Sequence, residues 1–242
     1  MRRFFIEPTA INGDQALLEG ADAHHLLHVL RLKSGEQVEL FSGDGLVHLA
    51  RIEGGDRDRV QLRLLSSSDT PPGNLAIHLG QAMLKGKKMD LVVQKCTELG
   101  VAAIHPYLSA HTKSPPPERG KIERWQRIIQ ESCKQCNQPW PPDCRPARTF
   151  DEILAQAGAY DLCLICWEQS EAPPLRRVVE EITRPASLLV MIGPEGGFSP
   201  EEIQRAKNCG FLPVGLGRRT LRAETAAIAA IALLQYIFDD LL

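Results

Sequence analysis

The stretch SLLVMIGPEGGFSPEEI, residues 187–203, places a turn rich in glycine and proline between an apolar run and a helical pattern that begins at Ser199. Glycine and proline are the usual residues of connecting turns, so a simple turn is one interpretation. A loop after a parallel strand is also a common ligand site, because glycine bends sharply and carries no Cβ. The stretch alone leaves both interpretations open.

The same alternation of strand and helix extends through the second part of the chain. Apolar runs indicate strands at 75–83, 102–108, 161–167, 187–193 and 211–217. Helical patterns occur at 88–100, 121–136, 151–158, 174–182, 200–210 and from Ala223 onward. This order predicts a parallel sheet covered on both faces, with ligands at the carboxyl ends of its strands. Two of these ends, 192–198 and 215–226, are rich in glycine.

The first part of the chain has a different pattern. Residues 66–74, SSSDTPPGN, predict a linker, and the segments before it indicate a small barrel of short strands at 2–6, 15–20, 37–43, 46–52 and 59–65. A helix is predicted at 21–32, with the basic side chains on one arc and the apolar ones opposite. The basic set is His24, His28 and Arg31, and the apolar set is Leu26, Leu27, Val29 and Leu30. A solvated face and a phosphate-binding stripe both remain open.

Composition narrows the class of protein. The chain has 242 residues, 43% hydrophobic and 24% charged, as in ordinary globular proteins of one large or two modest domains. The N-terminus lacks the apolar stretch of a signal peptide, and the apolar segment 226–238 is too short to span a bilayer. We therefore expect a cytoplasmic protein without a membrane partner. The net charge is −2, although 113–148 and the KGKK of 85–88 are locally basic.

The usual metal and phosphate motifs are missing. Seven cysteines form an odd number, and the C-x-x-C at 163–166 lies in a predicted strand, where residues three apart point to opposite faces. His24 and His28 lack the intervening Glu and a third ligand. We expect neither a disulfide framework nor a metal site. The sequence also lacks the G-x-G-x-x-G and G-x-x-x-x-G-K-[ST] phosphate motifs.

Four motifs together carry a resemblance to a known family. They are IGPEGGFSPEEI (192–203), LGRRTLRAETAAIAAI (216–231), KMDLVVQKCTELGVAAIHP (88–106) and ERWQRIIQESCKQC (123–136). With RRFF (2–5) and HHLLHVLRLKSGEQVELFSGDG (24–45), the whole chain resembles the RsmE family, the 16S rRNA uracil-N3 methyltransferases of the SPOUT class. The resemblance implies a PUA-like β-barrel that binds RNA (1–72) and an α/β SPOUT methyltransferase domain (73–242). That domain would have a parallel sheet and a deep C-terminal trefoil knot.

The resemblance also implies the reaction and its partners. S-adenosylmethionine would donate a methyl group to N3 of one uridine, in naked 16S rRNA or in the assembled small ribosomal subunit, and no metal would be needed. The implied cofactor residues lie in the two glycine-rich loops and at the start of the last helix. They are Gly193, Glu195, Gly196, Gly197, Leu216, Gly217, Leu221, Thr225 and Ala226.

Uracil N3 must lose a proton before it attacks, and the ring then carries negative charge. Arg222 is the candidate that stabilises this charge, with a phosphate contact or a salt bridge to Glu224 as alternatives. Glu195 and Glu224 are the candidates for removing the proton, although either could instead accept hydrogen bonds from loop amides. Basic residues would hold the RNA through phosphates, so binding should weaken with salt. They are Arg2, Arg3, His24, Arg31, Lys85, Lys87 and Lys88.

The chain departs from the family pattern at two places. Many members have an acidic-Arg-Ser segment where this chain reads SAHTKSPPPERGK (109–121), and Glu-Gln-x-Gly-Arg where it reads KQCNQPW (134–140). Asn137 and Gln138 thus occupy the Gly-Arg positions. We expect both segments to face RNA and the cofactor pocket to be unaffected.

The last helix is apolar nearly all round, which favours either a two-fold homodimer or burial within one chain. In a dimer, each active site could take residues from both chains. Two other functions remain open. The chain could be a catalytically silent RNA-binding protein, or a SPOUT enzyme that acts on tRNA or on another rRNA base.

Overall fold

The chain folds into two units, each built around its own sheet. The computed structural model describes residues 1–169, 171–180 and 182–238. Unit 1 comprises Met1–Pro72 together with Cys133–Pro141, and unit 2 comprises Gly73–Ser132 and Pro142–Leu242. The segment Cys133–Pro141 therefore belongs to the first unit although it lies within the sequence of the second.

Unit 1 contains a six-stranded, mostly antiparallel sheet in the order β1-β4-β5-β6-β3-β2. The strands are β1 (Arg3–Phe5), β2 (Ile11–Asn12), β3 (Gln15–Glu19), β4 (Gln37–Phe41), β5 (Leu46–Asp56) and β6 (Arg59–Asp69). Alternate residues such as Val38 and Leu40 are fully buried, because successive side chains of a strand point to opposite faces. The five strands predicted here are confirmed, and the short β2 was not predicted.

Two predictions for unit 1 are wrong. The linker was predicted to begin at residue 66, but β6 continues to Asp69, where Leu46 of β5 pairs with it. Residues 66–69 form backbone hydrogen bonds with β5 although their side chains are exposed. The serine-rich composition therefore suggested a linker where the strand continues. The helix predicted at 21–32 consists of α1 (Gly20–His24) and a π-helical turn, η2 (His25–Val29). Arg31 lies beyond it with φ of 55°, and Val29 is 60% exposed rather than buried beside Leu26.

Segment 133–141 has structural contacts within unit 1. Lys134 Nζ lies 2.7 Å from Asp22 Oδ1, and the two side chains are only 11% and 27% exposed. Trp140 Nε1 donates to the Thr70 carbonyl at 2.8 Å. Asn137 follows the end of α3 (Arg119–Cys136) with φ of 60°, a conformation that glycine and asparagine adopt most readily at helix ends. Substitution of Asn for the family's glycine therefore preserves the helix end.

Unit 2 contains a parallel sheet in the order β10-β8-β7-β12-β11-β13, with β9 paired to β8. The strands are β7 (Ala76–Ala82), β8 (Ala103–Leu108), β9 (Asp143–Cys144), β10 (Arg148–Thr149), β11 (Leu162–Cys166), β12 (Ser187–Ile192) and β13 (Leu212–Val214). Besides α3, its helices are α2 (Lys88–Glu98), α4 (Phe150–Leu154), α5 (Leu175–Val179), α6 (Pro200–Asn208) and α7 (Ala223–Ile237). The predicted parallel sheet is confirmed. The helix predicted at 151–158 is shorter, and a 3-10 turn, η3 (Ala157–Ala159), follows it.

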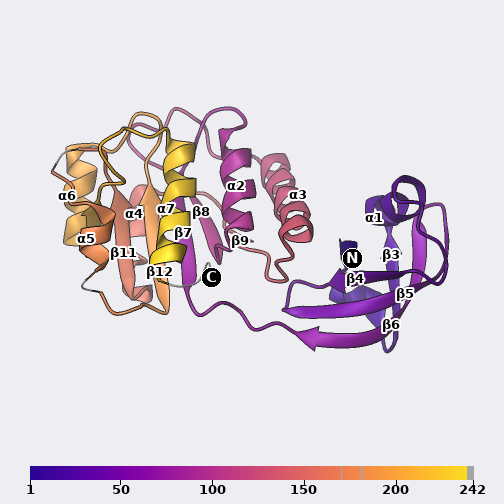
Figure 1. Ribbon diagram of the computed structural model, residues 1–242. Coiled ribbons are helices and arrows are strands. Elements are labelled where there is room, and N and C mark those ends of the chain that lie inside the picture. Colours follow the sequence, from indigo (N-terminus) through magenta and orange to yellow (C-terminus); the bar gives the residue numbers. More distant parts are fainter. Residues whose placement is uncertain (170, 181, 239–242) are drawn as a thin grey trace. The chain divides into compact units, whose positions relative to one another are not determined.

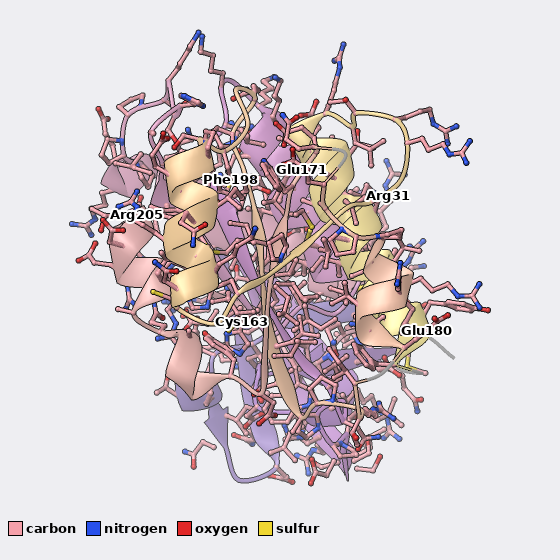
Figure 2. The ribbon with its side chains drawn as sticks, turned by 90° about the vertical axis from the view of Figure 1, so that its left-hand side faces the viewer. Arg31, Cys163, Glu171, Glu180, Phe198 and Arg205 are labelled. Carbon is pink, nitrogen blue, oxygen red and sulfur yellow. The ribbon has the colours of Figure 1, made fainter. Side chains whose placement is uncertain are left out.

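Helices cover both faces of this sheet. On one face, Phe150 of α4 and Ile203 of α6 pack with Leu189 and Met191 of β12 in one buried cluster. Arg205 of α6, labelled in Figure 2, also pairs with Asp151 of α4 at 2.7 Å. Alternation along β12 directs Val190 to the other face, where α7 packs on β7 and β12 and lies beside α2 (Figure 1). Because β12, β11 and β13 are parallel neighbours, their carboxyl ends meet at one edge of the sheet.

Candidate functional site

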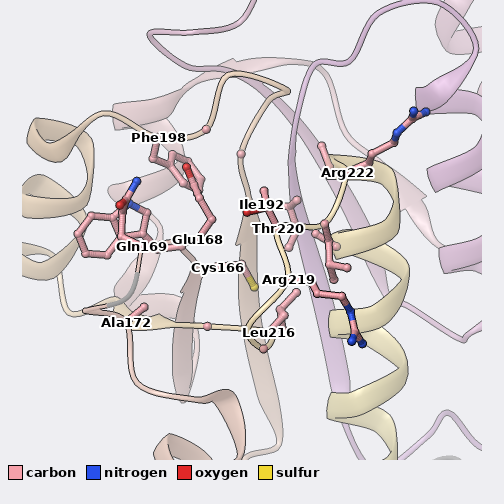
Figure 3. Close-up of a pocket in the computed structure, with 18 of the residues that line it drawn as sticks. Cys166, Glu168, Gln169, Ala172, Ile192, Phe198, Leu216, Arg219, Thr220 and Arg222 are labelled. Atoms are coloured by element: carbon pink, nitrogen blue, oxygen red, sulfur yellow. The ribbon is translucent and has the colours of Figure 1, made fainter.

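A cavity of about 970 Å³ lies at this edge of unit 2. Its walls come from three loops, 167–174 after β11, 193–198 after β12 and 215–222 after β13, together with Lys88 and the start of α7. Two of these loops are the glycine-rich strand ends singled out in the sequence. The structure brings them to opposite sides of one cavity (Figure 3).

Loop 193–198 needs glycine because neighbouring groups approach its backbone closely. A Cβ on Gly196 would lie 2.9 Å from the Cβ of His111, and a Cβ on Gly197 would overlap the carboxylate of Glu168. Gly197 also has φ of +70°, which side chains disfavour. The loop ends at a capping box, in which Ser199 accepts from Glu202 N and Glu202 accepts from Ser199 N. Local sequence thus fixes the point where the loop enters α6.

A second segment supports this loop from outside. Glu202 is 1% exposed, and its other oxygen accepts from Ala110 N at 2.9 Å. His111 Nδ1 lies 3.1 Å from the Gly196 carbonyl and 3.2 Å from that of Gly197, so it donates to this pair. Segment 109–121 therefore contacts loop 193–198, and these contacts were not predicted from the sequence. Its first residues hold loop 193–198, a contact between residues too far apart in sequence for local patterns to reveal.

Glu195 is engaged in anchoring the same loop. Its Oε1 accepts from Lys85 N at 3.2 Å and from Lys88 Nζ at 2.9 Å, at the start of α2. Burial raises the pKa of Glu195, but the hydrogen bonds from Lys88 and from backbone amides outweigh it and hold the pKa below its ordinary value. The carboxylate stays ionised at neutral pH, and Lys88 is its partner.

Loop 215–222 is attached to the loop after β11. Gly215 N donates to the Pro173 carbonyl at 2.8 Å, and Leu175 N donates to the Gly215 carbonyl at 2.9 Å. At the far end of this loop, Arg222 is the N-terminal flanking residue of α7. Figure 3 shows Glu168 and Phe198 on one side of the cavity and Arg219 and Arg222 on the other, with both guanidinium groups directed away from Glu168.

The structure gathers most of the predicted cofactor and catalytic residues around the cavity. Lys88 and the following residues line it: Gly193, Glu195, Gly196, Gly197, Leu216, Gly217, Leu221, Arg222 and Ala226. Thr225 is exposed on α7, and Glu224 is 8% exposed; neither lines the cavity. Glu224 Oε2 is buried without a hydrogen-bond partner among the described residues.

The predicted RNA-binding residues differ in their availability. Arg2, His24, Arg31, Lys85 and Lys87 are exposed. Arg3 is not, because its side chain is 9% exposed, donates to Glu39 at 3.1 Å and lies over the Phe41 ring. His24 and His28 do share a face, with ring centroids 4.6 Å apart.

Sequence reasoning missed one wall of the cavity. The third wall, which faces the two glycine-rich loops, consists of Cys166, Trp167, Glu168, Gln169, Ala172 and Pro174. Arg218 and Arg219 add two cations. The missed signal was the position of β11, whose carboxyl end must lie beside that of β12 in a parallel sheet. Burial raises the pKa of the Cys166 thiol to about 12, so it stays protonated at neutral pH.

Other kinds of site find no support in the described part of the chain. It has no group of three or more His, Cys, Asp or Glu side chains placed to hold a metal ion. All seven cysteines are unbridged. No helix among the described residues has the length and apolar character needed to cross a membrane.

The fold and the cavity define a class that comparison with known families makes explicit. Residues 71–235 match an RNA methyltransferase domain, and residues 18–65 match the PUA domain of RNA methyltransferases. The chain is thus an RNA methyltransferase with an N-terminal PUA-like domain.

It is 33% identical over 239 residues to the ribosomal RNA small subunit methyltransferase E of Synechocystis, covering 98% of this chain and 78% of that protein. The Bacillus subtilis protein of the same name is 28% identical, with 98% and 96% covered. The chain belongs to the ribosomal RNA small subunit methyltransferase E family.

Solved structures show the same fold with a cofactor bound. The enzyme of this name from Neisseria gonorrhoeae, crystallised with S-adenosylmethionine, has a TM-score of 0.87 at 33% identity, with 98% of each chain covered. A methyltransferase structure from Legionella pneumophila, also with this cofactor, has a TM-score of 0.89 at 34% identity and the same coverage.

Proposed function

We propose that this protein transfers a methyl group from S-adenosylmethionine to N3 of one uridine of 16S rRNA. The observation that carries this proposal is the meeting of loops 193–198 and 215–222 around one cavity edged by Arg218, Arg219 and Arg222. The names of the relatives support the small-subunit rRNA as substrate, and the cofactor-bound structures support the methyl donor. A ribosomal substrate supports the proposal that the protein acts in the cytoplasm.

The cavity fits the cofactor in size and chemistry. Its volume of about 970 Å³ is within the range of small-molecule sites. The glycine-rich loops present bare backbone, which can recognise an adenine edge through amide and carbonyl groups in fixed positions. Backbone of Gly193, Gly196, Gly197, Leu216 and Gly217 would hold the cofactor, with Leu221 and Ala226 closing the pocket. Thr225 is exposed and lies outside the lining, so we do not expect it to contact the cofactor.

The reaction needs positioning and a cation more than it needs a strong base. Bound S-adenosylmethionine supplies an electrophilic methyl group. Arg222 edges the cavity without an ion pair to any described residue, so its charge is available for the uracil ring as N3 loses its proton. Glu195, held by Lys88 and with a lowered pKa, is better suited to anchoring its loop than to accepting that proton. Glu224 lies outside the lining.

RNA binding would involve both units. We take residues 1–72 as the PUA-like RNA-binding domain and residues 73–242 as the methyltransferase domain. The exposed cations Arg2 and Arg31, with His24, would contact phosphates from the first, and Lys85 and Lys87 from the second. Such contacts position an RNA without specifying its sequence. Extrusion of the target base from its neighbours would then bring N3 to the cavity.

The C-terminal part of unit 2 is proposed to form a trefoil knot. The chain leaves β13, is hydrogen-bonded to residues 173–175 through Gly215, and then crosses to α7, which packs against β7 and β12. These attachments are those expected of a segment threaded through a loop. An experimentally determined chain trace in which 215–222 passes outside the loops would contradict the knot.

A homodimer is proposed on the apolar surface of the last helix. Leu233 and Tyr236 of α7 are 41% and 64% exposed, and Leu91 of the neighbouring α2 is 40% exposed. A second copy related by a two-fold axis would cover these side chains. The cavity lies at the start of α7, so the partner could contribute to each site.

Methylation mapping would test the function. The purified protein is incubated with S-adenosylmethionine and, separately, small ribosomal subunits, naked 16S rRNA and tRNA, and methylated nucleotides are then mapped by mass spectrometry. We expect 3-methyluridine at a single position of 16S rRNA. Product only in tRNA would replace the substrate assignment, and calorimetry showing no cofactor binding by folded protein would favour a silent RNA-binding protein.

A further inference from the structure

Some charged side chains around the cavity form ion pairs and others do not. Six charged residues line it: Lys88, Glu168, Glu195, Arg218, Arg219 and Arg222. Lys88 and Glu195 neutralise each other at 2.9 Å. Among the described residues, Glu168 has neither a hydrogen bond nor an ion pair, and the three arginines have no ion pair. Glu168 is therefore the one unmatched anion among the described residues of the lining.

Glu168 is an exposed residue whose carboxylate lies directly beside loop 193–198. It follows β11, and its carboxylate lies so close to Gly197 that a Cβ there would overlap Oε1. Figure 3 shows it on the wall opposite Arg219 and Arg222, whose guanidinium groups are directed away from it. The arginines therefore do not compete for this carboxylate. The cavity has an acidic side at loop 193–198 and a basic side at loop 215–222.

The two sides suit the two molecules that must meet there. RNA phosphates are anions, so they would bind on the side that carries the arginines. An ionised carboxylate accepts hydrogen bonds only, so its ligand must bring donors. The methyl donor carries two kinds, the neighbouring hydroxyls of the ribose and the α-ammonium group. A ligand of net positive charge also gains from an anion in a lining with an excess of cations.

We propose that Glu168 is a cofactor-binding residue whose carboxylate accepts hydrogen bonds from the ribose hydroxyls or the α-ammonium group of S-adenosylmethionine. This inference rests on the proposed function. The absence of a Cβ on Gly197 leaves room for the Glu168 carboxylate. It also allows that carboxylate to lie beside the loop that would hold the cofactor. Glu168 would set both the affinity for the cofactor and its orientation.

Calorimetry with the isosteric variant Glu168→Gln tests the proposal. Dissociation constants are measured for S-adenosylmethionine, S-adenosylhomocysteine and methylthioadenosine, which keeps the ribose but lacks the amino-acid tail. We expect binding of the first two to weaken about tenfold, the loss typical of one charge-assisted hydrogen bond. The matched control is Glu171→Gln, an exposed acid of the same loop that does not line the cavity, for which no change is expected.

Methylthioadenosine separates the two donors. An equal loss for it supports hydrogen bonds to the ribose, and an unchanged affinity supports the ammonium group. Unchanged affinity for all three ligands would overturn the proposal. So would a loss confined to S-adenosylmethionine, which would make Glu168 a counter-charge for the sulfonium instead. Failure of the wild-type protein to bind any of the three would instead refute the proposed function.

Discussion

At the scale of single residues, Arg222 is the residue for which we propose a catalytic role. It lines the cavity, precedes α7 and forms no ion pair with a described residue. A cation close to the ring would stabilise the negative charge that develops as N3 loses its proton, and such groups contribute strongly to catalysis. Its neighbours Arg218 and Arg219 also line the cavity but lie further from the start of α7, and we propose that they contact RNA phosphates.

Replacement of Arg222 should separate turnover from binding. We expect Arg222→Ala to lower kcat by at least about 100-fold while the dissociation constant of S-adenosylmethionine stays unchanged. Single-turnover methylation and calorimetry measure the two quantities. Arg177→Ala, an exposed arginine of α5 outside the cavity, is the matched control. Equal losses of turnover and cofactor affinity would show that Arg222 supports the pocket instead.

Gly196 offers a steric test at the same scale. Its backbone does not require glycine, but a Cβ would lie 2.9 Å from the Cβ of His111. Gly196→Ala should displace loop 193–198 and weaken cofactor binding about tenfold, within the usual cost of overpacking. The double variant with His111→Gly removes the clash but also the hydrogen bonds to the Gly196 and Gly197 carbonyls, so it should recover only part of the affinity. As a control, Gly158→Ala adds a Cβ that meets nothing within 4 Å. Equal cofactor affinities for the two alanine variants would show that loop 193–198 accommodates a Cβ beside His111 without moving.

At the scale of elements, two histidines on neighbouring strands make unit 2 sensitive to acid. His78 Nδ1 of β7 lies 3.0 Å from His105 Nε2 of β8, and the Tyr160 hydroxyl lies 3.2 Å from His78 Nδ1. Burial, then the charges of His78, Arg145 and Arg148, lower the pKa of His105 from 6.5 to about 4. Burial and Arg145, opposed by Asp143, lower the pKa of His78. Both rings are therefore neutral in the folded protein at neutral pH.

The pH dependence of stability follows from these directions. In the unfolded chain each histidine takes up a proton near pH 6.5, whereas folded His105 resists protonation until about pH 4. The free energy of unfolding should therefore fall as the pH is lowered from about 6.5 to about 4. Urea unfolding at several pH values measures it. His105→Gln should show a shallower dependence, and equal slopes for the two proteins would rule out this histidine as the cause.

Elements were predictable from sequence where the pattern is long and periodic. The strands β7, β11 and β12 and the helices α2 and α7 lie where apolar periodicity places them. The two-residue strands β9 and β10 were missed because so short a segment carries no period. Helix 21–32 was overextended, since periodicity does not reveal that η2 ends at Val29.

The site was predictable only in part. The glycines of its two loops were identified, since glycine signals a special backbone and the family motifs fall there. The contacts that give each residue its role were not. Glu195 meets Lys88, 107 positions away, and Gly197 meets Glu168 on another strand end. Such pairs arise from the packing of the sheet and leave no local pattern.

At the scale of the whole molecule, the exposed apolar face of α7 predicts the oligomeric state. Lysines at Leu233 and Tyr236 would place charge on the proposed two-fold interface. We expect the wild-type protein to sediment as a dimer and the Leu233→Lys, Tyr236→Lys variant as a monomer. Leu212→Lys, at a residue of β13 that is also 40% exposed, should leave the dimer intact. A wild-type protein that is monomeric at micromolar concentration would exclude this interface.

The assignment of Cys133–Pro141 to unit 1 has a consequence for anyone who wishes to take the molecule apart. A fragment ending at Pro72 would lack Trp140, which covers Gly45 and bonds to Thr70, and Lys134, the partner of Asp22. A variant that exchanges unit 1 for another domain must therefore include residues 133–141 in the exchange. The boundary between the units in the sequence, near residue 72, therefore differs from their boundary in space.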